Sequence, residues 1–295
     1  MEKNEKEGEM LRRLPAWMKV SLPGAGKFFD LRTLVRENSV HTVCESASCP
    51  NIGHCWANGA LTLMILGDRC TRACRFCDVA TGNVLPLDPD EPEKVARILS
   101  LLKLKYAVIT SVDRDDLPDG GAAHWAETIR KTREYSPELK LEVLIPDFKG
   151  DLRLVGRVCE SAPHVLAHNI ETVPSLQEKV RPQCRYKWSL DTLRHARSIF
   201  GLTVKSGIML GMGEKKGEVI QAMEDLVAVG CSILTLGQYL RPSRSHLEVV
   251  EYVSPEVFSE YKAIGESLGL DHVEAVPLVR SSFNADKQAQ AAGLR

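Results

Sequence analysis

The sequence has no excess of charge of either sign and no long apolar run. Lys and Arg total 38 and Asp and Glu total 39, so the chain has no net basic field to attract nucleic acid. No apolar stretch approaches the length that a membrane helix needs. The first ten residues, MEKNEKEGEM, lack the apolar core of a secretory signal and hold more acids than a mitochondrial transit peptide. We expect a cytoplasmic protein without a nucleic-acid or membrane partner.

The cysteines do not suit a fully paired disulfide framework, because their number is odd, at nine. A reducing compartment, in which thiols remain available to metals, is the expected environment. Six of the cysteines form two groups of three that are fifteen residues apart, spaced C-x4-C-x5-C and C-x3-C-x2-C. The first group is Cys44, Cys49 and Cys55, and the second is Cys70, Cys74 and Cys77.

Neither group has a fourth cysteine, which weighs against a structural zinc site with four protein ligands. Three thiolates suit a cubic iron–sulfur cluster in which one iron is left for another ligand. An iron with an open position can bind a substrate, so the pattern predicts chemistry and not only structure. A disulfide or zinc site at the second group is the simpler alternative.

Short β-branched or apolar runs alternate with segments of helical period from residue 61 onward. Such alternation is typical of parallel strands with right-handed crossovers. The predicted helices span residues 91–102, 124–135, 150–161, 189–201, 218–230 and 254–269. The predicted strands begin at Leu61, Tyr106, Lys140, His164, Thr203 and Cys231, with a short seventh at His272. Fewer than eight units predict an α/β fold, an incomplete (β/α) TIM-type barrel of about six strands.

The barrel occupies residues 61–277 in this interpretation. Residues 1–60 form an irregular N-terminal extension that carries the first cysteine group, and residues 278–295 form a C-terminal tail. In such barrels the loops after the strands form the active face. The second cysteine group follows the first barrel strand directly, so we expect it at the mouth of the barrel.

The segment CTRACRFC, with Phe76 as its aromatic residue, resembles the signature of the radical S-adenosylmethionine superfamily. The resemblance implies that Cys70, Cys74 and Cys77 hold a 4Fe–4S cluster whose fourth iron binds S-adenosylmethionine. Its reductive cleavage would give a 5′-deoxyadenosyl radical that takes hydrogen from an unactivated carbon. This signature alone indicates a superfamily and no particular reaction.

The segment VCESASCPNIGHCW is similar to the auxiliary-cluster motif of the lipoyl synthase family. ITSVDRDDLPDGGAAHW, VLAHNIETV, KSGIMLGMGE and PLVRSSF are similar as well, in matching order. The resemblance implies a sulfurtransferase that inserts sulfur at C6 and C8 of a protein-bound octanoyl-lysine. Two S-adenosylmethionine molecules would be used, and the cluster at Cys44, Cys49 and Cys55 would be the sulfur donor.

The family's terminal Arg-Ser-Ser-Tyr motif supplies a serine ligand to the auxiliary cluster. Spacing assigns this role to Ser282, with Ser281 as the less favoured candidate. The sequence departs from the family at Phe283, where the family has Tyr, and at His54, where the family has an acid. The phenolic hydroxyl is therefore replaced or dispensable in this chain, and we interpret His54 as a surface change.

Other positions give weaker signals for S-adenosylmethionine binding. Asn169 and Glu171 follow a strand, and Lys205 lies within one, so each is a cofactor contact or ordinary polar packing at the barrel mouth. Gly120 and Gly121 either let the backbone approach the cofactor or only shape a turn.

A run of acids near these positions has the composition of a metal site. We expect an arginine-paired loop there, formed with Arg114. The acids are Asp113, Asp115 and Asp116.

The family resemblance also implies partners. These are octanoylated lipoyl carrier domains, namely 2-oxoacid dehydrogenase E2 subunits and the glycine cleavage H protein. A low-potential electron donor such as ferredoxin or flavodoxin and an iron–sulfur carrier that rebuilds the spent cluster are expected too. Two other hypotheses remain at this stage: a different two-cluster radical enzyme, and a non-catalytic electron carrier or zinc-stabilised binding module.

Overall fold

A computed structural model describes residues 14–20 and 26–294 of the chain. The charged first ten residues lie outside this range. The molecule is built on one eight-stranded sheet with strand order β1-β2-β3-β4-β5-β6-β7-β8, and β2 to β8 run parallel. The parallel strands are β2 (Thr62–Ile65), β3 (Tyr106–Ser111), β4 (Lys140–Leu144), β5 (Val165–Ala167), β6 (Thr203–Leu210), β7 (Ile233–Gln238) and β8 (His272–Ala275).

The sheet curves into an open barrel with two edges. Strand β1 (His41–Thr42) pairs antiparallel with β2 and forms one edge, and β8 forms the other. The predicted incomplete α/β barrel is confirmed, although the expected number of about six strands is too low. The short strand β8 completes the parallel series, and β1 has only two residues, too few for any period to be visible in the sequence.

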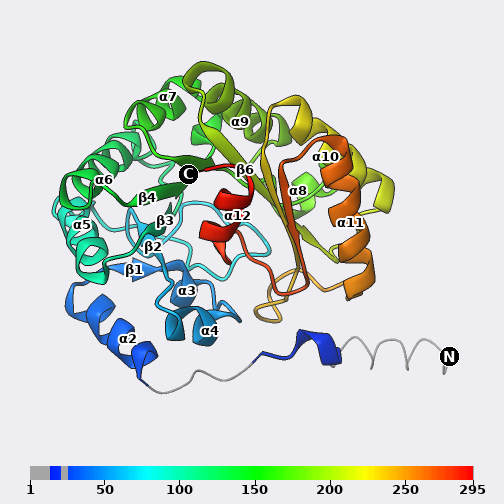
Figure 1. The fold of residues 1–295 in the computed structure, drawn as a ribbon, viewed down its shortest axis with the longest axis horizontal. Helices are drawn as coiled ribbons and strands as arrows, with labels where there is room; N and C mark the ends of the chain where they lie inside the picture. The colour runs from blue at the N-terminus through cyan, green and yellow to red at the C-terminus, as the bar shows by residue number, and fades with distance from the viewer. Residues whose placement is uncertain (1–13, 21–25, 295) are drawn as a thin grey trace.

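Six helices lie along the outer surface of the curved sheet (Figure 1). They are α5 (Glu91–Leu102), α6 (Ala122–Tyr135), α7 (Leu152–Glu160), α9 (Tyr186–Phe200), α10 (Lys216–Ala228) and α11 (Pro255–Leu268). All six match predicted segments. Short helices lie between some of them: η2 (Phe148–Gly150), η3 (Pro174–Leu176) and α8 (Gln177–Val180).

The ends of the outer helices follow from local sequence. Pro92 and Pro255 stand in the first turns of α5 and α11, where a missing N–H costs nothing. Gly201 and Gly269 end α9 and α11 at φ values of 66° and 112°, in the left-handed region that glycine adopts without strain. Every residue of β2 and β7 is buried, because one face packs on helices and the other faces the barrel interior.

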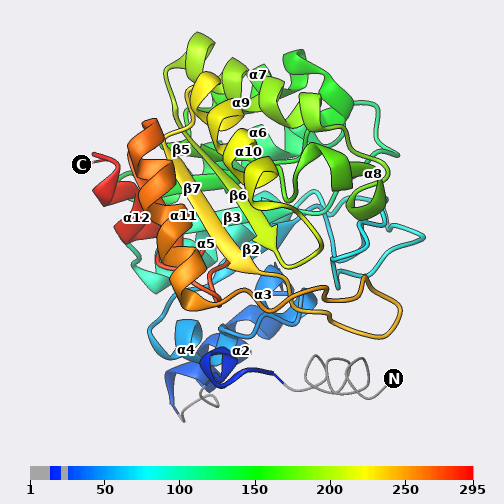
Figure 2. The ribbon, with the colours of Figure 1, turned by 90° about the vertical axis from the view of Figure 1, so that its right-hand side faces the viewer.

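The segments before and after the barrel are more regular than the sequence predicts. The N-terminal extension contains η1 (Ala16–Met18), α2 (Lys27–Glu37), α3 (Val43–Ser46) and α4 (Ile52–Ala57). The expected tail ends in helix α12 (Ala285–Ala291), which contacts β3 and β8. Figure 2 shows α12 at the end of the barrel opposite the loop that bears Cys70, Cys74 and Cys77, so α12 closes that end.

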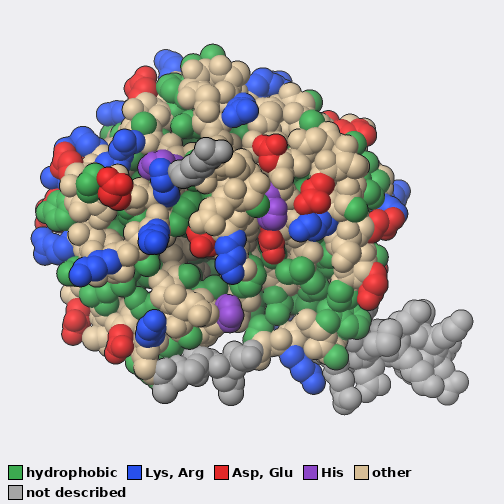
Figure 3. Space-filling model, in the orientation of Figure 1, with side chains coloured by type: hydrophobic (Ala, Val, Ile, Leu, Met, Phe, Trp, Pro, Cys, Tyr) green, Lys and Arg blue, Asp and Glu red, His purple; other side chains and the backbone are tan. Residues whose placement is uncertain are grey.

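The surface carries both charges in mixture. Lys, Arg, Asp and Glu side chains are interspersed over the face drawn in Figure 3. Among the described residues, no helix is both long enough and apolar enough to cross a bilayer.

Candidate functional site

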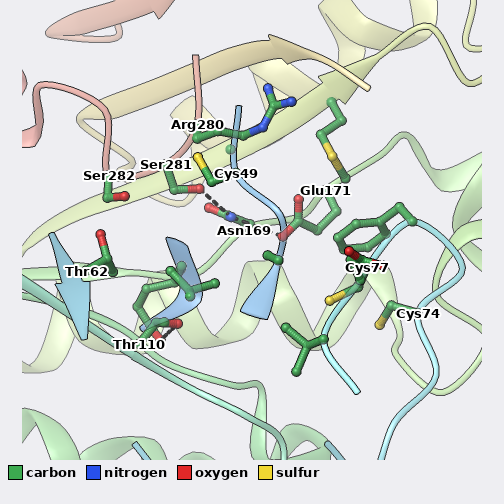
Figure 4. Close-up of a pocket in the computed structure, with 18 of the residues that line it drawn as sticks. Cys49, Thr62, Cys74, Cys77, Thr110, Asn169, Glu171, Arg280, Ser281 and Ser282 are labelled. Atoms are coloured by element: carbon green, nitrogen blue, oxygen red, sulfur yellow. Dashed lines mark hydrogen bonds between the residues drawn. The ribbon is translucent and has the colours of Figure 1, made fainter. Parts of the chain in front are cut away.

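A cavity of about 530 Å³ opens at the carboxyl ends of the parallel strands. Its wall combines residues from the N-terminal extension, the barrel loops and the C-terminal segment (Figure 4). Five of the six grouped cysteines line it: Cys44, Cys49, Cys70, Cys74 and Cys77. Position and composition therefore agree with the expectation that chemistry occurs at the mouth of the barrel.

The loop after β2 presents Cys70, Cys74 and Cys77 to this cavity. The Cys70 N–H donates to the Ala80 carbonyl at 2.8 Å, which closes the loop at its base. The Cys70 sulfur accepts from the backbone N–H groups of Arg72 at 3.4 Å and Asp113 at 3.3 Å. Donors aimed at sulfur favour a thiolate ligand and tune the potential of a cluster bound to it.

Arg72 fixes this loop to the barrel, a role that its place in the motif does not reveal. Its guanidinium is buried and makes ion pairs with Asp115 and Asp147 at 2.8 Å each, and with Asp113 at 3.3 Å. The predicted arginine-paired acid loop is confirmed in part, because Arg114 pairs with Asp116 alone.

Cys184 is a second residue near this loop that sequence reasoning missed. It is buried, and Arg72 Nη1 donates to its sulfur at 3.2 Å. A hydrogen bond between the Cys74 and Cys184 thiols raises the pKa of Cys74 and lowers that of Cys184. The sequence separates these cysteines by more than a hundred residues, so no local pattern could join them.

The first cysteine group lies on α3, α4 and the turn between them. Cys44 is in α3, Cys55 is in α4, and the Cys49 N–H donates to the Cys44 carbonyl at 3.1 Å. Cys44 and Cys49 line the cavity, whereas Cys55 lies behind them. Burial raises the pKa of Cys55 to about 12, and the charges of Cys49 and Cys44 add to this shift. The three thiols therefore lie close enough to interact.

Two side-chain contacts hold the separate parts of the wall together. Ser48, between Cys44 and Cys49, donates a hydrogen bond to Asp78, the residue after Cys77. Asn51 Nδ2 donates to the Leu278 carbonyl at 2.7 Å, which joins the N-terminal extension to the C-terminal segment. The two cysteine groups and the tail are therefore fixed around one cavity.

The C-terminal serines reach the same cavity. Ser281 and Ser282 both line it together with Cys49, and Figure 4 draws Ser281 on the side of Cys49 with Ser282 further along the segment. The Ser281 hydroxyl accepts a hydrogen bond from Asn169 Nδ2 at 2.6 Å. The structure thus brings both candidate serines to the first cysteine group.

The two positions that depart from the family pattern lie against each other. The rings of His54 and Phe283 are 6.2 Å apart between centroids, within the range of a weak aromatic contact. His54 is therefore more than an isolated surface change, because it pairs the first cysteine group with the tail.

The expected cofactor contacts divide into two sets. Phe76, Asn169 and Glu171 line the cavity. Burial raises the pKa of the Glu171 carboxyl, and its φ of 64° places a non-glycine residue in the left-handed region, as is common at functional sites.

Lys205, Gly120 and Gly121 are not brought to the cavity wall. Lys205 is buried in the barrel and pairs with Glu142 at 2.9 Å. Gly120 and Gly121 have φ values of 57° and 86° in the turn before α6. A Cβ atom at Gly121 would lie 2.7 Å from the Leu66 side chain.

The donor set fits iron–sulfur chemistry. Burial raises the pKa of Cys70 to about 12 and that of Cys77 to about 11, so these thiols stay protonated unless a cation stabilises the thiolates. The buried atom Asn169 Oδ1 lacks a hydrogen-bond partner among the described residues. Across the same residues, no three His, Cys, Asp or Glu side chains converge on a site for a single metal ion.

Comparison with known proteins identifies the superfamily and the family of the chain. Residues 64–226 match the radical SAM superfamily. Lipoyl synthase of Bacteroides fragilis is 50% identical over 275 residues, which cover 93% of this chain and 95% of that protein. The chain belongs to the lipoyl synthase family. A mitochondrial member from Nematostella vectensis is 52% identical over 92% of this chain and 94% of its own, and one from Thermus thermophilus is 52% identical over 94% and 86%.

Solved structures support the fold of this lipoyl synthase family member. HydG, a maturase of the [FeFe]-hydrogenase, superposes with a TM-score of 0.58 at 13% identity, over 99% of this chain and 70% of its own. Methylornithine synthase gives 0.55 at 14% identity, over 88% and 87%. The family implies a 4Fe–4S cluster and S-adenosylmethionine as cofactors.

Proposed function

We propose that the chain makes the lipoyl group with two 4Fe–4S clusters that share one cavity. The Cys70, Cys74 and Cys77 thiols would hold the cluster that binds S-adenosylmethionine. The Cys44, Cys49 and Cys55 thiols, with Ser282 as fourth ligand, would hold the auxiliary cluster. The observation that carries the proposal is that five of the six grouped cysteines and both serines of the C-terminal segment line the same cavity of about 530 Å³.

The reaction replaces one C–H bond at C6 and one at C8 of an octanoyl arm by C–S bonds. When bound, the cofactors supply the radical that removes each hydrogen atom and the sulfur that replaces it. The chain would supply a cavity wall along which an unbranched hydrocarbon can lie. Apolar side chains contribute a large part of the cavity wall, among them Met64, Val79, Leu144, Ile145, Ile208 and Val279.

The chain's polar residues position the reactants. The N–H donors at Cys70 favour its thiolate form, and Arg72 keeps the loop from shifting. Glu171 and Asn169 lie between the two cysteine groups, where their polar atoms can contact the amino or ribose groups of S-adenosylmethionine. A serine oxygen is a hard ligand for iron that prefers thiolate, so Ser282 would dissociate readily when sulfur is withdrawn.

The octanoyl arm would arrive on a lipoyl carrier domain, from an E2 subunit of a 2-oxoacid dehydrogenase or from the glycine cleavage H protein. The reductant would be a ferredoxin or flavodoxin, because sulfonium cleavage needs the low end of the iron–sulfur potential range. An iron–sulfur carrier would rebuild the spent auxiliary cluster in a cytoplasmic setting.

Isotope transfer tests the proposal directly. The protein is reconstituted anaerobically with 34S-labelled sulfide, desalted, and given S-adenosylmethionine, a reductant and an octanoylated carrier peptide. We expect about eight iron atoms per chain, as two 4Fe–4S clusters require. Mass spectrometry should find labelled sulfur in the lipoyl product. Unlabelled product would exclude the auxiliary cluster as donor.

Two serine variants decide the fourth ligand. Ser282→Ala should keep 5′-deoxyadenosine formation and lose lipoyl product, whereas Ser281→Ala should keep a larger share of product. The opposite ranking would assign the ligand to Ser281, which lies beside Cys49 in Figure 4.

A further inference from the structure

Asn169 connects the two halves of the cavity through a single amide group. It follows β5, and its side chain is buried. Nδ2 donates to Ser281 Oγ at 2.6 Å and to Glu171 Oε1 at 3.0 Å, as Figure 4 shows. A primary amide has two N–H donors, and an ionised carboxylate only accepts, so both hydrogens of Asn169 are committed to these partners.

The barrel leaves a fitted space for this amide. A Cβ atom at Gly207 would lie 2.9 Å from Asn169 Oδ1 and 2.7 Å from Thr235 Oγ1, closer than real contacts allow. The Asn169 backbone carbonyl accepts from Arg181 Nη1 at 3.0 Å. The side-chain amide is therefore confined by β6 and β7, and a buried arginine holds the Asn169 backbone. The amide has little freedom to turn away from Ser281.

The two partners of Asn169 differ in how firmly they are held. The Glu171 N–H donates to the Gly207 carbonyl, and its own carbonyl accepts from the Met209 N–H, both at 2.9 Å, so Glu171 is fixed to β6. Ser281 stands on the segment between β8 and α12, outside any helix or strand. Asn169 thus ties a connecting segment to a rigid part of the barrel.

The partners also face different cysteine groups. In Figure 4, Ser281 is drawn on the side of Cys49, and Glu171 is drawn between Asn169 and Cys77. The Asn169 amide therefore links Glu171, which is fixed to β6, to the serine segment.

We infer that Asn169 is a positioning residue that sets the serine segment against the first cysteine group and couples its place to Glu171. The role of Asn169 in the reaction rests on the proposed function. Its role in holding the serine segment rests on the hydrogen bonds alone. Asn169 acts in this scheme through Ser281, in addition to any contact that it makes with S-adenosylmethionine.

Hydrogen exchange of the full-length, cluster-free protein tests the structural claim without any turnover. In Asn169→Leu, which keeps the size and removes the donors, amides of the peptide over residues 279–283 should exchange about tenfold faster, because one hydrogen bond to the segment is lost. Ser281→Ala should give a similar increase. The double variant should exchange no faster than either single variant, because both substitutions remove the same hydrogen bond.

A peptide from α9 serves as the internal control, and its exchange should not change. Asn169→Asp is measured in parallel, because its isosteric side chain also lacks the amide donors and does not depend on how leucine packs beside Glu171. Unchanged exchange at residues 279–283 in both Asn169 variants would overturn the inference, as would full additivity in the double variant.

Product ratios test the coupling in the loaded enzyme. Asn169→Leu should bind iron as the unaltered protein does, yet form about tenfold more 5′-deoxyadenosine per lipoyl group, because radicals form while the serine segment is misplaced. An equal loss of both products would mean that Asn169 serves only S-adenosylmethionine and would overturn the inference. If the unaltered protein makes no lipoyl group, the proposed function fails, and the exchange data still judge the Asn169 contact.

Discussion

Arg72 is the residue on which the second cysteine loop most depends. Its guanidinium is about 2% exposed and is shared among three carboxylates and the Cys184 sulfur. A planar group with five donors can satisfy several partners at once, which a lysine ammonium cannot. A lysine here would keep the charge but could not serve all of these partners, so ion pairs of Arg72, including that with the buried Asp147, would be broken.

We expect Arg72→Lys to destabilise the protein by about 3 kcal/mol, the lower range for breaking a buried ion pair. Iron retained after reconstitution and desalting should fall together with stability. Arg75→Lys makes the same change at an exposed position of the same loop and should leave both unchanged. Equal iron content in the two variants would show that Arg72 does not hold the cysteine loop in place.

The cysteines themselves separate the two proposed clusters. Any alanine replacement at Cys70, Cys74 or Cys77 should abolish 5′-deoxyadenosine formation. A replacement at Cys44, Cys49 or Cys55 should abolish lipoyl formation and leave part of the 5′-deoxyadenosine. Chromatography measures both products in each variant. Full lipoyl yield from any of the six variants would refute the assignment of that cysteine to a cluster.

His168 predicts a pH dependence of stability. Burial lowers its pKa from 6.5 to about 4, while its ring nitrogens bond to the Ile145 carbonyl and the Ser189 hydroxyl. The unfolded chain then binds a proton between these pH values that the folded chain does not. Stability should therefore fall as pH drops from about 6.5 to 4, by roughly 3 kcal/mol from this group.

Urea unfolding of the cluster-free protein at pH 7.5 and pH 5 measures this effect. His168→Gln removes the titrating group and should reduce the difference in unfolding free energy between the two pH values. A variant with the full difference of the unaltered protein would show that other groups cause it.

At the scale of elements, the outer helices could be predicted because their signals are local. Helix α5 has proline and glutamate in its first turn and an apolar stripe, and its predicted and observed bounds agree. Helix α12 has only alanine and polar residues, ADKQAQA, so no apolar period revealed it. Its burial against β3 and β8 is a tertiary effect, as is the folding of α3 and α4 around the first cysteine group.

The turn before α6 shows how an element depends on one glycine. Gly121 has a φ of 86°, and a side chain there would meet Leu66 at 2.7 Å. Gly121→Ala should cost about 1–3 kcal/mol, because strain and overlap act together. Gly217→Ala, in the first turn of α10 with open space around it, should be neutral or stabilising by about 0.5–1 kcal/mol. Urea midpoints of the two variants test the contrast.

At the scale of the whole molecule, the sequence predicted the site only where residues lie close along the chain. The two cysteine spacings and the serine pair were visible as motifs, and the structure gathers them at one cavity. The partners of Arg72 and the Cys74–Cys184 contact depend on how distant loops meet, which no local pattern encodes. The place of Lys205 in a strand makes it a candidate cofactor contact. Its ion pair with Glu142 depends on how β4 and β6 are placed in the barrel, which the local sequence does not show.

The cavity wall runs from Val43 to Ser282, and α12 closes the far end of the barrel after that. During synthesis the final portion of a chain is still inside the ribosome when the earlier strands have already emerged. The cavity wall is thus incomplete until Ser282 has emerged from the ribosome. On the proposed assignment of Ser282 as fourth ligand, a nascent chain stalled before residue 280 would accept no serine-capped cluster at the first cysteine group.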